Sequence, residues 1–125
     1  MILLDTCALI WSLFESERLT PAAKQALRGN DRAVSIASLW EISIKTSLGK
    51  LSLPRTVTQI ADLCESTEIK ILPITPEECE AIQSLPFIHK DPFDRIIIAQ
   101  AMLLDMPILT EDEKIWRYDA VRSIW

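Results

Sequence analysis

The sequence contains few cysteines and no long apolar run, and each of these shortages excludes a class of protein. Cys7, Cys64 and Cys79 form no Cys-x-x-Cys pair, so neither a disulfide framework nor a zinc site of paired cysteines is indicated. We expect three buried thiols in a reducing compartment. No apolar stretch approaches the roughly 18 residues that a membrane-spanning helix needs, and residues 2–4 are too short for a signal peptide. We therefore expect a cytoplasmic protein with no membrane contact.

Positive charge is also scarce in the sequence. Lysine and arginine number 13 against 18 aspartate and glutamate residues, which gives a formal net charge of -5. This balance argues against a passive phosphate binder. It does not argue against an enzyme whose acidic side chains hold cations, because bound metal ions reverse the local charge. The length of 125 residues suits a single domain spanning residues 1–125.

Short apolar segments alternate with helical segments along the whole chain. Strands are predicted at residues 2–4, 33–36, 69–74, 107–110 and 120–123. Helices are predicted at residues 8–14, 22–28, 35–48, 57–64, 76–84 and 92–104. This alternation predicts an α/β fold, a three-layer sandwich in which a central, mostly parallel five-stranded sheet is flanked by helices. The first strand is apolar on both faces, which suits the middle of such a sheet.

The helix predicted at residues 92–104 has an unusual beginning. Asp91 is suited to cap the free N–H groups of its first turn, and Pro92 suits the first helical position. Asp94 then falls in the first turn, where the positive end of the helix favours a carboxylate. Asp94 is therefore a candidate ligand for a cation, although both acids could also serve only as a well-formed helix start.

Three further acidic residues lie where a predicted strand ends or a helix begins. Asp5 follows the first strand, Asp112 follows the fourth, and Glu41 lies in the early turns of the helix 35–48. Sites in parallel sheets form beyond the carboxyl ends of the strands. Carboxylates gathered there repel one another by about 4 kcal/mol at a separation of about 4 Å, and Mg²⁺ or Mn²⁺ with oxygen ligands removes that repulsion. Such a site is suited to phosphoryl transfer.

Glu41 also has two purely structural interpretations. Ser38 and Glu41 match a capping box, and Glu41 with Lys45 matches an ion pair one helical turn apart. These alternatives stay open from the sequence.

The order and the flanking residues of the four acids resemble those of a known family. The matching segments are Asp5-Thr6, Ser38-Leu39-Trp40-Glu41-Ile42, His89-Lys90-Asp91-Pro92-Phe93-Asp94-Arg95, Ile97-Ile98-Ala99-Gln100-Ala101 and Leu109-Thr110-Glu111-Asp112. Together they resemble a PIN domain, and most closely the VapC-type toxin ribonucleases of bacterial and archaeal toxin-antitoxin pairs. The resemblance extends over essentially the whole chain, and Asp-Pro-Phe-Asp-Arg is its most specific part.

The resemblance implies a metal-dependent endoribonuclease with four acidic site residues. Asp5 and Asp94 would be the principal Mg²⁺ ligands, with Mn²⁺ as the other candidate ion. Glu41 would complete the site or orient the attacking water, and Asp112 would act directly or through water. The implied partners are an RNA substrate, a small cognate antitoxin protein and a second copy of the chain in a homodimer.

The resemblance also assigns supporting roles to residues around the four acids. Thr6, Ser38 and Thr110 would hold the carboxylates by hydrogen bonds. Arg95 is a candidate for contact with a phosphate oxygen, and a salt bridge to a nearby acid is the equal alternative. His89 is expected to be a loop or packing residue, because the metal mechanism requires no histidine base.

Two other classes of protein compete with the nuclease hypothesis. A phosphoacceptor receiver domain also has an aspartate after an early strand, but it needs paired acids there and another aspartate after its third strand. Here Asp5 stands alone, and the strand 69–74 ends without an acid. A non-catalytic PIN-like scaffold that acts only through contacts is the second alternative.

Overall fold

Five short strands form one sheet in which every neighbouring pair is parallel. The structure, a computed structural model, describes residues 1–125. Its strands are β1 (Ile2–Leu4), β2 (Arg32–Ser35), β3 (Ile69–Leu72), β4 (Ile108–Leu109) and β5 (Ser123–Ile124). They lie in the order β3-β2-β1-β4-β5. The predicted α/β sandwich is confirmed, and β1 occupies the centre of the sheet.

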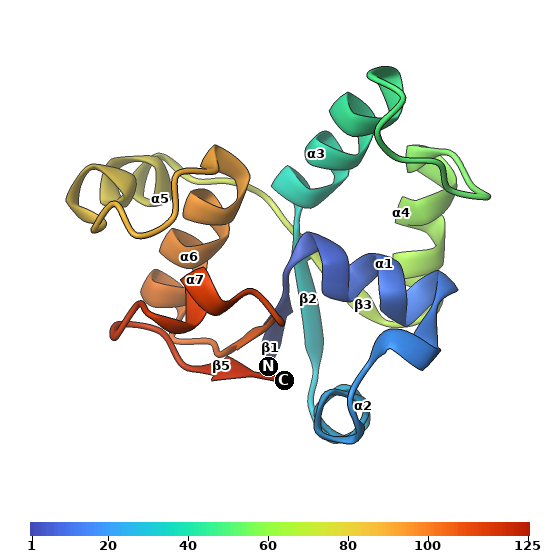
Figure 1. Cartoon of the computed structure of the whole chain (residues 1–125), viewed down its shortest axis with the longest axis horizontal. Coiled ribbons are helices and arrows are strands. Elements are labelled where there is room, and N and C mark those ends of the chain that lie inside the picture. Colours follow the sequence, from blue (N-terminus) through green and yellow to red (C-terminus); the bar gives the residue numbers. More distant parts are fainter.

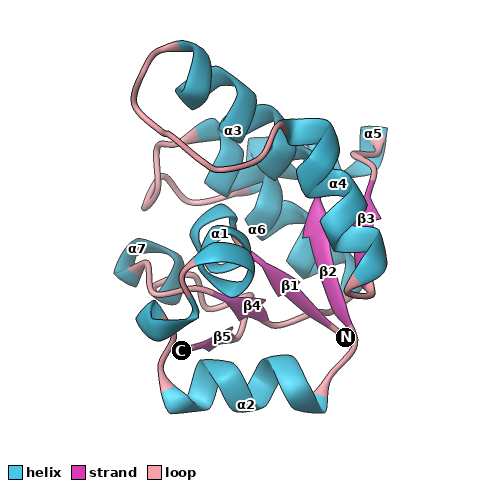
Figure 2. Cartoon of the chain, turned by 90° about the vertical axis from the view of Figure 1, so that its right-hand side faces the viewer, coloured by secondary structure: helices cyan, strands magenta, loops and turns pink.

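Helices cover both faces of this sheet. They are α1 (Thr6–Phe14), η1 (Ser16–Arg18), α2 (Pro21–Gly29), α3 (Ile36–Ser47), α4 (Val57–Ser66), α5 (Pro76–Ala81), η2 (Ile82–Ser84), α6 (Pro92–Leu104) and α7 (Glu113–Trp116). Figure 1 shows α5, α6 and α7 on one side of the sheet and α1 and α4 on the other. In Figure 2 the strands can be followed between these layers, with α2 running below them.

Side chains of the strands alternate between two hydrophobic cores. In β1, Ile2 and Leu4 belong to the core under α1, α2 and α4, whereas Leu3 belongs to the core under α6 and α7. The same division separates Leu109 from Ile108 in β4. All five side chains are at most 1% exposed. Burial on both faces explains why these strands are continuous apolar runs rather than alternating ones.

The order of the strands places a crevice beside the end of β1. The connection from β1 to β2 runs over one face through α1 and α2, and the connection from β3 to β4 runs over the other through α5 and α6. Ligands of open parallel sheets bind where such connections diverge, outside the carboxyl ends of the strands. The residues that directly follow β1 and β4, Asp5 and Thr110, stand at this point.

Some boundaries and one burial prediction are wrong. The fifth strand was expected at residues 120–123 but pairs only at Ser123–Ile124, because Val121 enters the core from a loop without pairing. The short helix α7 was not predicted. Of the three thiols only Cys64 is buried, whereas Cys7 and Cys79 are exposed. Every helix of the structure is too short or too polar to cross a lipid bilayer.

Candidate active site

Asp5 enters the site from the end of the central strand. It is the N-cap of α1, and its Oδ1 accepts the N–H of Ala8 at 2.8 Å. The hydroxyl of Thr110, at the end of the neighbouring strand β4, also donates a hydrogen bond to this carboxyl group. The oxygen of that hydroxyl accepts the N–H of Asp112 at 3.0 Å. Thr110 therefore links the two acids that follow β1 and β4.

Glu41 projects from α3 into a set of hydrogen bonds that occupies both of its oxygens. The hydroxyl of Thr6 donates to Oε1 at 2.6 Å and lies 2.9 Å from the hydroxyl of Ser38. Lys45, one turn further along α3, places its ammonium 2.5 Å from Oε2. The predicted ion pair is present, whereas the capping-box alternative is wrong because the N-cap of α3 is Ser35.

Asp94 lies in the first turn of α6, as the sequence predicts. Asp91 is the N-cap of this helix, and its Oδ1 accepts the N–H groups of Phe93 and Asp94 at 2.8 and 3.1 Å. Pro92 occupies the first helical position. Because Asp91 accepts these backbone N–H groups, the carboxylate of Asp94 does not serve as a helix cap.

Asp112, at the start of α7, brings its carboxylate close to that of Asp94. It caps α7 by accepting the N–H of Lys114 at 2.8 Å through Oδ1. Its Oδ2 lies 2.8 Å from Nε2 of His89, and Oδ2 of Asp94 lies 3.1 Å from the same nitrogen. His89, expected to be a loop or packing residue, is a buried loop residue whose ring contacts two of the four acids.

One cavity of about 260 Å³ brings the four predicted acids together. It is lined by Asp5, Thr6, Cys7, Glu41, Lys45, Asp94, Glu111 and Asp112. Lys45 is the only basic residue among them. The cavity therefore gathers more negative charge than its own positive charge can balance.

Two carboxyl groups of the cavity have strongly raised pKa values. Burial, as the largest cause, together with the charges of Asp91 and of the three other predicted acids of the cavity raises the pKa of Asp94 from 3.8 to about 8. Burial also raises the pKa of Asp5 to about 6, against the hydrogen bonds from Thr110 and Ala8 that lower it. Desolvation and like charges both disfavour the ionised form. Without a cation, the pocket retains protons near neutral pH.

Arg95 does not face the cavity, and its predicted contact with a phosphate is wrong. The side chain is buried, with 5% of the residue exposed. Its guanidinium donates to backbone carbonyls at 3.0 to 3.2 Å, namely those of Ile82, Leu85, Pro86 and His89. No carboxylate pairs with it, so the salt-bridge alternative is wrong as well. Arg95 instead fixes the loop that leads into α6.

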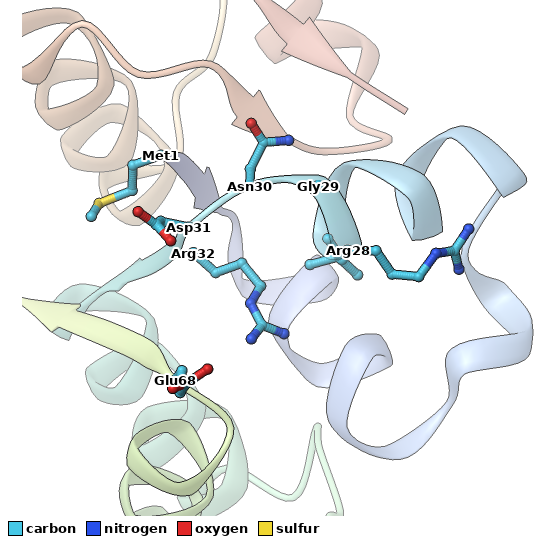
Figure 3. Close-up of a pocket in the computed structure, with 8 residues that line it drawn as sticks. Met1, Arg28, Gly29, Asn30, Asp31, Arg32 and Glu68 are labelled. Carbon is cyan, nitrogen blue, oxygen red and sulfur yellow. The ribbon is translucent and has the colours of Figure 1, made fainter.

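A larger cavity, of about 520 Å³, lies at the other end of the sheet. Figure 3 shows residues that line it, which come from the N-terminus, the end of α2, the start of β2 and the residue before β3. Arg28 and Arg32 line it together with Asp31 and Glu68, so it carries charges of both signs. Arg32 is moreover engaged with the carbonyl of Thr67 at 2.6 Å. The lining of this larger cavity does not concentrate one kind of chemical group, whereas the acidic cavity concentrates carboxyl groups.

Sequence reasoning missed the participation of His89, Cys7 and Glu111. Cys7 and Glu111 are direct neighbours of site residues, so adjacency alone could have suggested them. His89 could have been suggested only by its position two residues before the cap of α6, and that position does not specify where the ring points.

The fold and the cavity define a class of protein, an α/β domain with a carboxylate cluster at the carboxyl end of a parallel sheet. The family model described as the PIN domain matches residues 2–121. The chain therefore belongs to the PIN domain family. No curated protein sequence matches it significantly.

Solved structures resemble the chain over nearly its full length. A toxin-antitoxin complex from Klebsiella pneumoniae is 24% identical with a TM-score of 0.64, and 97% of this chain and 95% of that chain are covered. VapBC2 from Rickettsia felis, bound to a DNA fragment from its promoter, is 15% identical with a TM-score of 0.71 over 98% and 97% of the two chains. FitAcB from Neisseria gonorrhoeae is 19% identical with a TM-score of 0.63 over 98% and 96%. At these identities the likeness establishes the fold.

Proposed function

We propose that this PIN domain is a metal-dependent endoribonuclease that hydrolyses RNA phosphodiester bonds and acts as the toxin of a toxin-antitoxin pair. The observation that supports the proposal most is the convergence of Asp5, Glu41, Asp94 and Asp112 on one cavity. Membership of the PIN domain family supports it independently.

The residues of the cavity fit a hard divalent cation. Its four carboxyl groups offer oxygen donors, the ligands that Mg²⁺ and Mn²⁺ prefer. The raised pKa values of Asp5 and Asp94 fit as well, because burial first and neighbouring carboxylates second disfavour the ionised forms, and a cation would stabilise those forms. A divalent cation in such a site lowers the pKa of water and stabilises negative charge on a phosphate.

Each side chain of the cavity has a proposed role toward the cation. Asp5 and Asp94 would be its principal ligands, and Asp112 would contribute directly or through water. Glu41, which is held by the hydroxyl of Thr6 on its Oε1 and by Lys45 on its Oε2, would complete the site or orient the attacking water. Lys45, with 45% of its side chain exposed, lies at the rim and attracts the phosphate backbone. Its hydrogen bond to Glu41 raises the pKa of Lys45, which keeps it positively charged.

Two observations support the proposed protein partners: the similar solved structures and an exposed apolar region of the surface. Similar structures include toxin-antitoxin assemblies, which suggests a small antitoxin as the partner of this chain. An apolar hollow beside the acidic cavity includes Trp40 and Phe93, and Trp40 is 60% exposed. Exposed aromatic side chains of this kind are frequent at protein interfaces. We propose a homodimer as the free form, to be tested by sedimentation.

The decisive experiment is cleavage of a mixed RNA pool by the purified chain with Mg²⁺, with Mn²⁺ and with chelator. We expect cleavage only with a divalent cation, and a loss of at least about 100-fold in Asp94→Asn. Asp62→Asn is the matched control, because Asp62 is an exposed acid on α4. A non-catalytic scaffold would show no cleavage by the wild type, and equal cleavage by Asp94→Asn would also contradict the proposal.

The role as a toxin needs a separate test in growing bacteria. Expression of the wild type is expected to stop growth, and Asp94→Asn to have no effect at the same protein level. Growth arrest by both would show that toxicity does not depend on the acidic cavity.

A further inference from the structure

His89 is held in one place by contacts to its backbone and its ring. The loop that contains it lies between η2 and α6, and the residue is 7% exposed. Its N–H donates to the hydroxyl of Tyr118 at 2.8 Å, and this hydroxyl donates to the carbonyl of Pro86 at 2.7 Å. Arg95 donates to the carbonyls of both Pro86 and His89. The imidazole is thus presented by an anchored loop rather than a mobile one.

The two ring nitrogens of His89 have different partners, and these determine where the ring proton lies. Nδ1 accepts the backbone N–H of Asp91 at 3.2 Å. An amide nitrogen only donates, so Nδ1 is the acceptor of this hydrogen bond, and Nε2 is the nitrogen that is left to donate. Nε2–H points at Oδ2 of Asp112 and at Oδ2 of Asp94, at 2.8 and 3.1 Å. Both oxygens therefore act as acceptors of one shared donor.

This arrangement bears on whether His89 is itself a ligand. Atoms of His89, Asp94 and Asp112 lie within 4.8 Å of one another, which is compatible with a common metal ion. A ligating imidazole nitrogen must offer a lone pair, however, and the lone pair of this ring is on Nδ1, facing Asp91. In the observed geometry His89 donates to the two carboxylates and does not compete with them for the cation.

We propose that His89 is a positioning residue which, as an Nε2–H donor, joins Asp94 of α6 to Asp112 after β4. The shared proton offsets the repulsion between two carboxylates brought close together. It also fixes Oδ2 of each carboxylate. Hydrogen bonds of this kind orient metal ligands, and their loss lowers metal affinity or activity by about 10- to 100-fold. The proposal rests on the proposed function for its catalytic consequence only.

The first test is spectroscopic and needs no activity. His89 is the only histidine of the chain, so ¹⁵N-labelled protein gives a single imidazole in long-range ¹H–¹⁵N spectra. At neutral pH we expect a protonated Nε2 and an unprotonated Nδ1, with the same pattern after Mg²⁺ is added. A doubly protonated ring, a proton on Nδ1, or loss of the Nε2 proton on binding Mg²⁺ would overturn the proposal.

The second test compares variants that keep or remove the donor. The amide nitrogen of glutamine reaches about as far as Nε2, whereas that of asparagine reaches only about as far as Nδ1. We expect His89→Asn to bind Mg²⁺ about 10- to 100-fold more weakly in titration calorimetry and to lose kcat by a similar factor. His89→Gln should recover most of both. Circular dichroism and thermal unfolding verify that each variant is folded.

The outcomes separate this proposal from the proposed function. If the wild type binds Mg²⁺ but cleaves no RNA, the nuclease is wrong, while the ring spectrum and the calorimetry still decide the role of His89. If the wild type cleaves RNA and folded His89→Asn matches it in Mg²⁺ affinity and kcat, the role of His89 is wrong and the nuclease stands.

Discussion

The two sides of the acidic cavity neutralise their charge in different ways. On the Glu41 side, comprising Thr6, Ser38, Glu41 and Lys45, the chain supplies its own cation, and both carboxylate oxygens have partners. On the Asp94 side, comprising Asp5, His89, Asp94 and Asp112, no lysine or arginine is present and burial raises the pKa of two carboxyl groups. Ionisation is therefore most strongly disfavoured at Asp5 and Asp94, by burial first and by neighbouring carboxylates second. The cation of the proposed function would be held on that side.

The largest effect that would break this comparison is expected at Arg95, which anchors the loop of the Asp94 side. Arg95→Met leaves four buried carbonyls without their donors, and we expect unfolding to become easier by about 3 to 5 kcal/mol. The corresponding fall in Tm is about 10 to 20 °C for a domain of this size. Thermal unfolding measures it, with Arg18→Met as an exposed control. A change in Tm no larger than that of the control would show that the loop is held by other contacts.

A smaller effect concerns the pH dependence of the metal-free protein. A carboxyl group with a pKa of about 8 in the folded state and 3.8 in the unfolded state binds its proton more tightly when folded. Its contribution to stability is therefore complete below about pH 4 and is lost as the pH rises through about 8.

We expect the loss of stability at rising pH to come mainly from Asp94. In chelator, we expect the Tm of the wild type to fall between pH 6.5 and pH 9 by about 5 to 10 °C more than that of Asp94→Asn, which corresponds to about 2 kcal/mol. Added Mg²⁺ should restore the wild type at pH 9. Parallel pH profiles for the two proteins would place the pH-sensitive group elsewhere.

The smallest expected effect is a change in Mg²⁺ affinity when the positive charge on the Glu41 side of the cavity is removed. Lys45→Met removes the one positive charge of the cavity, and a unit charge within about 8 Å of a divalent ion is worth about 1 kcal/mol in water. We expect Mg²⁺ affinity to rise about 3- to 10-fold in titration calorimetry. Lys50→Met, outside the cavity, should leave it unchanged. Weaker binding by Lys45→Met would mean that Lys45 is needed to hold Glu41 in place.

The layers of the fold were predictable because their causes are local. Continuous apolar runs identify β1 and β2, and Thr20-Pro21 and Thr75-Pro76 fix the helix starts observed at Pro21 and Pro76. The pairing of β5 and the single turn of α7 were not predictable to the residue. Each involves only two to four residues, and tertiary packing rather than propensity decides such short elements.

The candidate site was predictable at its acids and not at its surroundings. Each acid follows a strand or lies in an early helical turn, and the parallel sheet brings those positions together. The environments of Arg95 and His89 depend on where the loop between η2 and α6 folds, because their partners are carbonyls and carboxylates of other segments. The residues that flank Arg95 and His89 do not indicate which carbonyls and carboxylates of other segments these side chains will contact.

The aromatic pair between α3 and α6 provides an intrinsic fluorescent probe next to the acidic cavity. The rings of Trp40 and Phe93 are 5.2 Å apart at 86°, and each residue directly precedes an acid, Glu41 or Asp94. Any sliding of one helix along the other changes the surroundings of the indole together with the gap between the two carboxylates. We therefore expect the fluorescence of Trp40, isolated by replacing the other three tryptophans with phenylalanine, to change when α3 and α6 move relative to each other.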